Sequence, residues 1–324
     1  MTAAPTPVAA AAPAAAVRRR TPGYLDPAPP ERLATLRILV VGFALGYLVV
    51  RTPHLLDVAR LADVAPGRFA PVGPLVLLDA PPAPVMVAAV LAVTIAAAAA
   101  GLVGWRWRVS GPVTALGFLL LTSHRSSWGQ IFHTENLVAL HLLVLAASAA
   151  ADARSLDARR RARTGGAPPV ADPRYGWPVR LAAVVVVVAY VLAGWAKLRT
   201  GGIDWVTGDA LRNHVAHDNL RKALVGDVWS PLGGWAVAHG WVFPPLAAAS
   251  LAVELAAPVA LLGGRWRTGW VLAAWSFHLG VLGLMAILFP YPLLGVAFAP
   301  FFALERLGWP PWRRVAGARV AAPR

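Results

Sequence analysis

Residues 180–198 read RLAAVVVVVAYVLAGWAKL, and this stretch decides the fold class. Sixteen uncharged residues in a row separate Arg180 from Lys197. A helix needs about 20 mostly apolar residues to cross the hydrocarbon core of a bilayer. The stretch therefore predicts a transmembrane helix rather than the buried helix of a water-soluble protein.

The composition of the whole chain agrees with a membrane protein. Of its 324 residues, 58% are hydrophobic and only 14% are charged, whereas soluble domains carry roughly 25% charged residues. The composition also excludes disorder over most of the length, because disordered chains are poor in apolar residues. Cysteine is absent, which excludes disulfides, thiolate nucleophiles and thiolate metal sites. We expect no metal site.

Similar apolar segments lie on both sides of this stretch. We therefore predict an all-α, polytopic transmembrane bundle of about eight spans. The third and fourth spans are short, and prolines interrupt the eighth. The expected spans are about 34–50, 84–103, 111–123, 136–151, 180–198, 242–262, 269–289 and 290–305.

The basic residues predict the orientation of the bundle. With the N-terminus inside, 21 of the 30 lysines and arginines fall on the cytoplasmic side, as the positive-inside rule expects. Both termini should then be cytoplasmic. The net charge of +15 reflects this topology and contact with anionic lipid. The lipid bilayer of the plasma membrane is thus the expected partner, and nucleic acid is not.

The segments outside the spans differ in character. Residues 1–33 are rich in alanine and proline and predict a disordered cytoplasmic tail, followed by a transmembrane domain over 34–305. Within this domain, 152–178 predicts a flexible cytoplasmic linker. The tryptophan-rich segment 199–241 predicts an interfacial cap on the outer face. Residues 306–324 form a basic cytoplasmic tail.

Lys197 is a candidate functional residue near the outer end of the fifth span. Only two of the 30 basic residues are lysines, Lys197 and Lys222. One reading is a snorkelling anchor, but Arg199 already supplies an anchor. A lysine shielded from water can lose its proton and act as a base, whereas an arginine cannot. Tyr190 and Gly194 share its helical face, where a glycine admits another helix or a flat ligand.

The connection between the third and fourth spans, TSHRSSWGQIFHTENLVALHLL, is crowded with polar residues. If the fourth helix begins near Phe132, His133 and His141 lie two turns apart on one face. The alternative is an outer-surface turn with Glu135 in the first helical turn, where the helix dipole favours a carboxylate. Asn136 follows it and is a further candidate for binding.

Two ionisable residues fall near the middle of later spans. Glu254, one turn after Ser250, needs a partner or a proton, and His278 is equally deep. Such residues usually face a bundle interior and mark functional sites, although each could be a structural hydrogen-bonding group. Together with Lys197 and His133 they predict a site in the outer half of the bundle, open to lipid-soluble substrates.

The segments AYVLAGWAKLRTGGIDWVTGDAL, VEL and SFHLGVLGLMAILFPYPLLG resemble the HTTM domain. This is the transmembrane domain shared by gamma-glutamyl carboxylases of the vitamin K type and their bacterial relatives. The resemblance runs from about residue 30 to 305. Its most specific part is A-G-x-x-K-L followed by D-W-V-x-G.

The resemblance implies roles for individual residues. Lys197 matches the lysine regarded as the catalytic base, with Ala196 in place of the preceding lysine. His133, which opens HTEN, matches a histidine ahead of the fourth span, and His278 matches the histidine of an F/Y-F-H segment. The family enzymes continue into a large extramembrane domain that is not seen in this sequence, so recognition of a protein substrate would need a separate protein partner.

The resemblance also implies a chemistry of the carbon–carbon lyase class. A reduced naphthoquinone would be the cofactor, and Lys197 would deprotonate its hydroxyl before reaction with oxygen yields a strong base. Such chemistry needs a dry cavity. His133 would form a hydrogen bond to an oxygen of the reaction centre, and Trp195 or Trp205 would pack against the quinone ring.

Two other functions remain open at this point. A quinone or haem oxidoreductase subunit could use His141 and His278 as axial ligands. A non-catalytic accessory or transport protein could use Glu254 and His278 as a proton or substrate path, and the broken eighth span is typical of transporters.

Overall fold

The protein is described by a computed structural model that covers residues 23–307. Within this range the chain is helical, and the one β-type contact is a single bridge between Ala28 and Asp172. The predicted all-α class is confirmed. Most of the two predicted tails lies outside the described residues, and the first helix already begins at Pro30.

The helices have the following bounds. The α-helices are α1 (Pro30–Ala59), α2 (Leu61–Val64), α3 (Pro84–Leu102), α4 (Trp107–Ser126), α5 (Asn136–Ala146), α6 (Leu156–Arg163), α7 (Pro173–Gly201), α8 (Asp204–Thr207), α9 (Ala210–Leu224), α10 (Pro231–Ala238), α11 (Phe243–Leu255), α12 (Gly264–Met285) and α13 (Pro290–Leu293). The 3-10 helices are η1 (Pro66–Arg68), η2 (Gly73–Leu77), η3 (Gly240–Val242), η4 (Ala257–Leu262), η5 (Val296–Phe301) and η6 (Leu304–Arg306).

Four helical segments in the described chain are long and apolar enough to cross a membrane: α1 with α2, α3, α7 and α12. A fifth span results if α10 and the helix after it, which meet at 99°, count as one. Helices α4 and α5 occupy the places of the short third and fourth spans. Eight spans and cytoplasmic termini therefore stay predictions.

The expected eighth span, 290–305, is not a continuous helix. It consists of α13 and two 3-10 helices. Pro290, Pro292 and Pro300 explain the interruption, because proline lacks an amide hydrogen and disfavours a helical residue before it. The expected sixth span, 242–262, likewise divides into α11 and η4.

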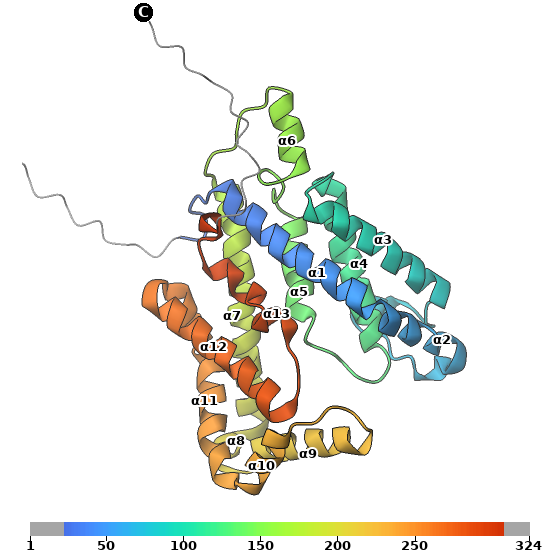
Figure 1. Cartoon of the computed structure of the whole chain (residues 1–324), viewed down its shortest axis with the longest axis vertical. Coiled ribbons are helices and arrows are strands. Elements are labelled where there is room, and N and C mark those ends of the chain that lie inside the picture. Colours follow the sequence, from blue (N-terminus) through green and yellow to red (C-terminus); the bar gives the residue numbers. More distant parts are fainter. Residues whose placement is uncertain (1–22, 308–324) are drawn as a thin grey trace, which may run out of the picture.

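Two groups of helices share α7 between them (Figure 1). The first group is α1, α3, α4 and α5, with a core that includes Leu48, Phe118 and Leu142. The second is α11 and α12 with η4 and η5, and its core includes Val186 and Trp270. Helix α7 packs on α1 and α5 and also on α11. The two groups also meet through η5, which contacts both α1 and α7.

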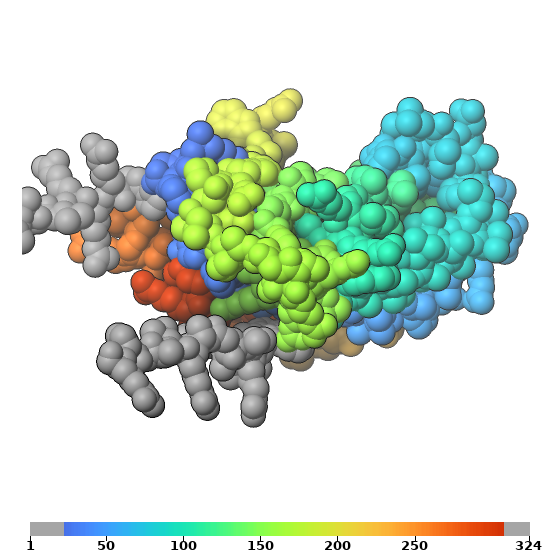
Figure 2. All heavy atoms as spheres, turned by 90° about the horizontal axis from the view of Figure 1, so that it is seen from above, coloured from blue at the N-terminus to red at the C-terminus, as the bar shows by residue number. Residues whose placement is uncertain are grey.

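The segment predicted as a linker, 152–178, contains helix α6 and closes one end of the molecule. Figure 2 looks onto this end, where the green residues around α6 lie between the blue start of α1 and the teal turn that joins α3 to α4. The Asp157 carboxylate accepts hydrogen bonds from the backbone N–H groups of Arg106 (3.0 Å) and Trp107 (2.9 Å). These are donors that a helix N-terminus leaves free, so Asp157 caps α4.

Arg37 has a structural role that the sequence did not reveal. Its side chain is fully buried and donates to the backbone carbonyls of Ala150 (3.0 Å) and Arg154 (2.7 Å). An arginine that the positive-inside rule counts as a topology signal therefore also ties α1 to the turn after α5.

The segment predicted as an outer cap, 199–241, contains α8, α9 and α10 and is hydrogen-bonded to the C-terminal end of α12. Asn219, Lys222 and Ser230 each donate a hydrogen bond of 2.5–2.9 Å to one of the carbonyls of residues 283–285. These carbonyls lie at the helix C-terminus, where they lack partners within the helix. The cap is thus fastened to the element that carries His278.

Candidate functional site

The centre of the site is an ion pair between two helices. The Lys197 ammonium, near the end of α7, binds the Oε1 atom of Glu254 on α11. The two side chains are 21% and 4% exposed. The second carboxylate oxygen, Oε2, is buried and has no hydrogen-bond partner among the described residues. Glu254 therefore has an ionic partner, but only one of its two carboxylate oxygens is hydrogen-bonded to a described residue.

Gly194 brings the two helices close enough for this pair. A Cβ atom placed on Gly194 would lie 3.0 Å from the Cβ of Glu254 and 2.9 Å from the Cδ2 of Leu255. The sequence allowed either a helix or a flat ligand at this glycine. The structure places helix α11 there.

Aromatic rings cover the Lys197 ammonium. Its Nζ atom lies 5.3 Å from the ring centroid of Trp205, on α8, and 5.8 Å from that of Phe277, on α12. Both distances suit cation–π attraction. The indole N–H of Trp205 is buried and has no hydrogen-bond acceptor within the part of the chain that the structure describes. Helix α8, within the segment predicted as a cap, thus contributes directly to the surroundings of Lys197.

Tyr190 and His278 form the deeper part of the site. The tyrosine hydroxyl and the Nε2 atom of His278 are 2.7 Å apart, and the Nδ1 atom of the histidine is buried without a hydrogen-bond partner in residues 23–307. Trp270 packs edge-on against Tyr190, with ring centroids 5.1 Å apart. Phe277 and Trp270 were not singled out from the sequence, because aromatic residues are common in apolar spans.

His133 reaches only the rim of this cluster. It is exposed and precedes α5, which begins at Asn136. Its ring lies 6.1 Å from that of Phe289, and Phe289 lies 5.1 Å from His278. Because α5 begins at Asn136, close to the expected start of the fourth span, the condition of a helix starting near Phe132 is not met, and His133 and His141 do not share a helical face.

Two predicted binding residues are not part of the cluster. Trp195 is exposed on α7, two positions before Lys197 and therefore on another side of the helix. Asn136 is exposed at the first position of α5. Of the two tryptophans expected to wall a ring, only Trp205 lies beside Lys197.

His141 has a different environment from the one that a haem ligand needs. It is fully buried, and its Nδ1 atom lies 2.6 Å from the Tyr291 hydroxyl and its Nε2 atom 3.0 Å from the Ala182 carbonyl. Both nitrogens are engaged, and His278 uses its Nε2 atom on Tyr190. The geometry therefore does not support a pair of axial ligands. Within residues 23–307, no group of three or more potential ligands could hold a metal ion.

A second buried ion pair, which the sequence did not reveal, lies in the other group of helices. Arg125, on α4, binds Oε1 of Glu135 at 2.8 Å. The Tyr47 hydroxyl donates to the same oxygen at 2.9 Å, and the Thr134 hydroxyl donates to Oε2 at 2.8 Å. The guanidinium also lies 3.6 Å from the ring centroid of Phe132. Glu135 precedes α5 directly, but its side chain binds these groups instead of capping the helix.

Comparison with known proteins adds one finding. The sequence matches the family model of the HTTM domain over residues 26–305, a range that contains every residue of the cluster. No curated protein and no solved structure matches the chain.

Proposed function

Since this chain belongs to the HTTM domain family, we propose that it is a multi-pass membrane enzyme in which Lys197 acts as a base on a lipid-soluble substrate. The observation that carries the proposal is the pair of Lys197 and Glu254. It is desolvated on the carboxylate side, incompletely hydrogen-bonded and covered by aromatic rings. Ionisable side chains that lie inside a membrane-spanning bundle usually mark functional sites.

Glu254 is the proposed acceptor of the proton that Lys197 must lose. An ammonium beside a carboxylate and a neutral amine beside a carboxylic acid differ by one proton moved along the hydrogen bond, and neither state has a net charge. A buried pair with no net charge avoids the large desolvation penalty of an isolated ion. The amine formed in this way accepts a proton from a substrate hydroxyl, and the ammonium that results balances the charge of the substrate oxyanion.

The side chains around Lys197 fit a flat ring that carries a hydroxyl group, such as a reduced naphthoquinone. Trp205 and Phe277 offer aromatic faces, and the unpartnered Oε2 atom of Glu254 offers an acceptor. The unpartnered Nδ1 atom of His278 is a further polar contact on the deeper side. When bound, the reduced ring would supply an acidic hydroxyl and reducing electrons.

The cap of α8, α9 and α10 limits the access of water. It places Trp205 over the ammonium and is fastened to α12 through three side chains. Exclusion of water is what base chemistry on a weak carbon acid requires. We extend this proposal to a carboxylase-like reaction in the plasma membrane. The substrate would be presented by a separate protein.

The test is oxygen uptake by proteoliposomes supplied with a reduced naphthoquinone. The variant Lys197→Arg keeps the charge but cannot release a proton, so we expect it to slow quinol-dependent uptake by about 100-fold or more. Glu254→Gln should slow it as well. The control is Arg199→Lys, at an exposed position two residues further along, which should leave the rate unchanged. A Lys197→Arg protein with the original rate would refute the base role.

One observation favours a second function, a transport or accessory role. Helices α10 and α11 meet at 99° across a short break, and broken helices are a feature of transporters. Glu254 and His278 would then form a proton path. Liposomes loaded with a pH-sensitive dye distinguish the two functions, because a transporter moves protons without consuming oxygen. Proton flux lost in Glu254→Gln, with no quinol-dependent oxygen uptake, would favour this second role.

A further inference from the structure

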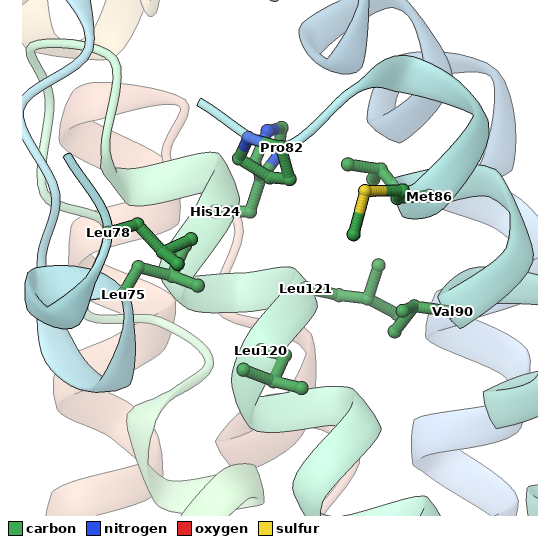
Figure 3. Close-up of a pocket in the computed structure, with 9 residues that line it drawn as sticks. Leu75, Leu78, Pro82, Met86, Val90, Leu120, Leu121 and His124 are labelled. Atoms are coloured by element: carbon green, nitrogen blue, oxygen red, sulfur yellow. The ribbon is translucent and has the colours of Figure 1, made fainter. Parts of the chain in front are cut away.

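A cavity of about 170 Å³ lies in the first group of helices, away from Lys197. It is bounded by η2, the segment that follows it, α3 and α4. Eight of its nine lining residues are apolar, and the ninth is His124. Figure 3 shows the imidazole rising from α4 toward Pro82, with Leu75 and Leu78 on one side and Met86 on the other.

His124 is the unusual member of this lining. Its side chain is only 3% exposed, and its Nε2 atom is buried without a hydrogen-bond partner among the described residues. His141, equally deep in the protein, has a partner for each ring nitrogen. Buried polar groups are almost always paired, so an unpaired nitrogen that borders a cavity points to a group that binds there.

The lining limits the chemistry of that group. No charged side chain borders the cavity, and a charge moved there without a partner would be strongly unfavourable. The bound molecule is therefore neutral where it meets His124. The volume is close to that of an apolar cavity of about 150 Å³ that binds benzene. A ring-sized apolar group therefore fits.

The cavity opens beside α3, one of the membrane-spanning candidates. Met86 and Leu78 line it and are also exposed on the molecular surface. Met86 lies in the first turn of α3, so the opening is near one end of the span. A molecule dissolved in the bilayer reaches the cavity here without crossing the protein.

We propose that this cavity binds the ring-sized apolar end of a neutral, lipid-soluble molecule, and that His124 Nε2 hydrogen-bonds a single oxygen on that ring. A phenol, an aryl ketone or another ring with one oxygen has this chemistry. The site is independent of the proposed reaction at Lys197, and either can be wrong without the other.

The chain has no cysteine, so one introduced cysteine can carry a unique trifluoromethyl label for fluorine NMR in lipid nanodiscs. Val85→Cys places the label on α3 beside the opening, at an exposed residue that does not line the cavity. Val93→Cys, exposed further along the same helix, is the control position. Three ligands of equal chain length are compared: 4-octylphenol, octylbenzene and 4-octylbenzoate.

We expect 4-octylphenol to shift the signal at residue 85 saturably, with no saturable change at residue 93. Octylbenzene should bind about tenfold more weakly, because a ligand without the oxygen leaves His124 unpaired. The charged benzoate should show no saturable binding. Equal midpoints for phenol and octylbenzene would overturn the role of the oxygen. Saturable benzoate binding would overturn the requirement for a neutral ligand.

Two substitutions at the histidine separate its hydrogen bond from its volume. His124→Phe should weaken phenol binding about tenfold, to the level of octylbenzene, whereas His124→Gln, which keeps a polar group, should retain most of it. Val90→Trp, at a lining residue, should remove binding of both ligands by filling the space. If His124→Phe does not fold, the comparison of phenol with octylbenzene in the labelled protein still decides the matter. Phenol binding unaffected by His124→Phe or by Val90→Trp would refute the proposed site.

Discussion

Two ion pairs that join neighbouring helices in the described part of the chain differ in how completely they are hydrogen-bonded. Arg125 and Glu135 are both less than one-tenth exposed, and both oxygens of the carboxylate accept hydrogen bonds. In the pair of Lys197 and Glu254, one carboxylate oxygen has no hydrogen-bond partner among the described residues, and the lysine side chain is partly exposed. The first pair joins α4 to the start of α5, and the second joins α7 to α11.

The proposed function assigns a structural role to the first pair and a reactive role to the second. A buried ion pair offsets its desolvation penalty only when additional hydrogen bonds satisfy the remaining lone pairs. Tyr47 and Thr134 do this for Glu135, so the position of its carboxylate is fixed. Glu254 lacks such partners for its Oε2 atom among the described residues, so its carboxylate is held by fewer hydrogen bonds than that of Glu135.

The largest expected effect is on stability and compares the two carboxylates directly. Glu135→Gln leaves Arg125 buried without its counter-charge, which should lower the free energy of unfolding by about 3–5 kcal/mol. Glu254→Gln should cost about 1–2 kcal/mol, because Lys197 is partly accessible to solvent. Denaturant unfolding in detergent micelles measures both values. Equal decreases in the free energy of unfolding would show that Glu135 is not held more strongly than Glu254.

A second prediction concerns the glycine that lets the reactive pair form. Gly194→Val should push α11 away from α7 and lower the free energy of unfolding by about 1–3 kcal/mol. Gly269→Val is the matched control, because a side chain at this helical glycine of α12 meets nothing within 4 Å. Thermal unfolding of the two variants gives the comparison. If both lose the same stability, the β-branched residue rather than the close contact is responsible.

The aromatic cover of Lys197 can be tested by its chemical reactivity. Because the chain has only two lysines, mass spectrometry can follow acylation of Lys197 by a water-soluble reagent without ambiguity. Trp205→Leu should raise the acylation rate about fivefold, since loss of a cation–π contact of about 1 kcal/mol frees the ammonium. Trp195→Leu, on the same helix as Lys197 but exposed, should not. If Trp195→Leu raised the acylation rate more than Trp205→Leu, Trp195 and not Trp205 would be the residue that covers Lys197.

The smallest effect is expected for a third ion pair, between Arg32 and Glu305 at one end of the bundle. Arg32 donates two hydrogen bonds to this carboxylate, at 2.6 and 2.8 Å, and they lower the pKa of Glu305 below its ordinary value. The pair therefore contributes stability above pH about 4.3, the pKa of an unfolded glutamate. This stability is lost as the pH falls through the lower pKa of the folded state.

Substitution of this carboxylate isolates the contribution. The free energy of unfolding of the unmodified protein should fall by about 1 kcal/mol more than that of Glu305→Gln between pH 6 and pH 3, because partly exposed pairs are weak. Unfolding measured at several pH values in the same detergent checks this. Parallel pH profiles for the two proteins would mean that the pair contributes nothing.

Individual site residues could be recognised from the sequence because charge within an apolar run is rare. Lys197, Glu254 and His278 were predicted on that ground, and the structure brings the first two into contact and places the third beside Tyr190. Arg37 and Glu135 lie near the ends of apolar runs, where charge is common. Their buried roles were therefore not predicted.

Apolar run length is a local property of the chain. The sequence alone therefore determined that this protein is a helical membrane protein and which residues are unusual within its helices. Pairing is a non-local property: Lys197 and Glu254 are 57 residues apart, and Tyr47 and Glu135 are 88 apart. Only the packing of α7 on α11, and of α1 beside α4 and α5, decided which buried carboxylate is fully hydrogen-bonded and which keeps an oxygen free. A polar group buried in a bundle takes its partners from whichever helices lie next to it.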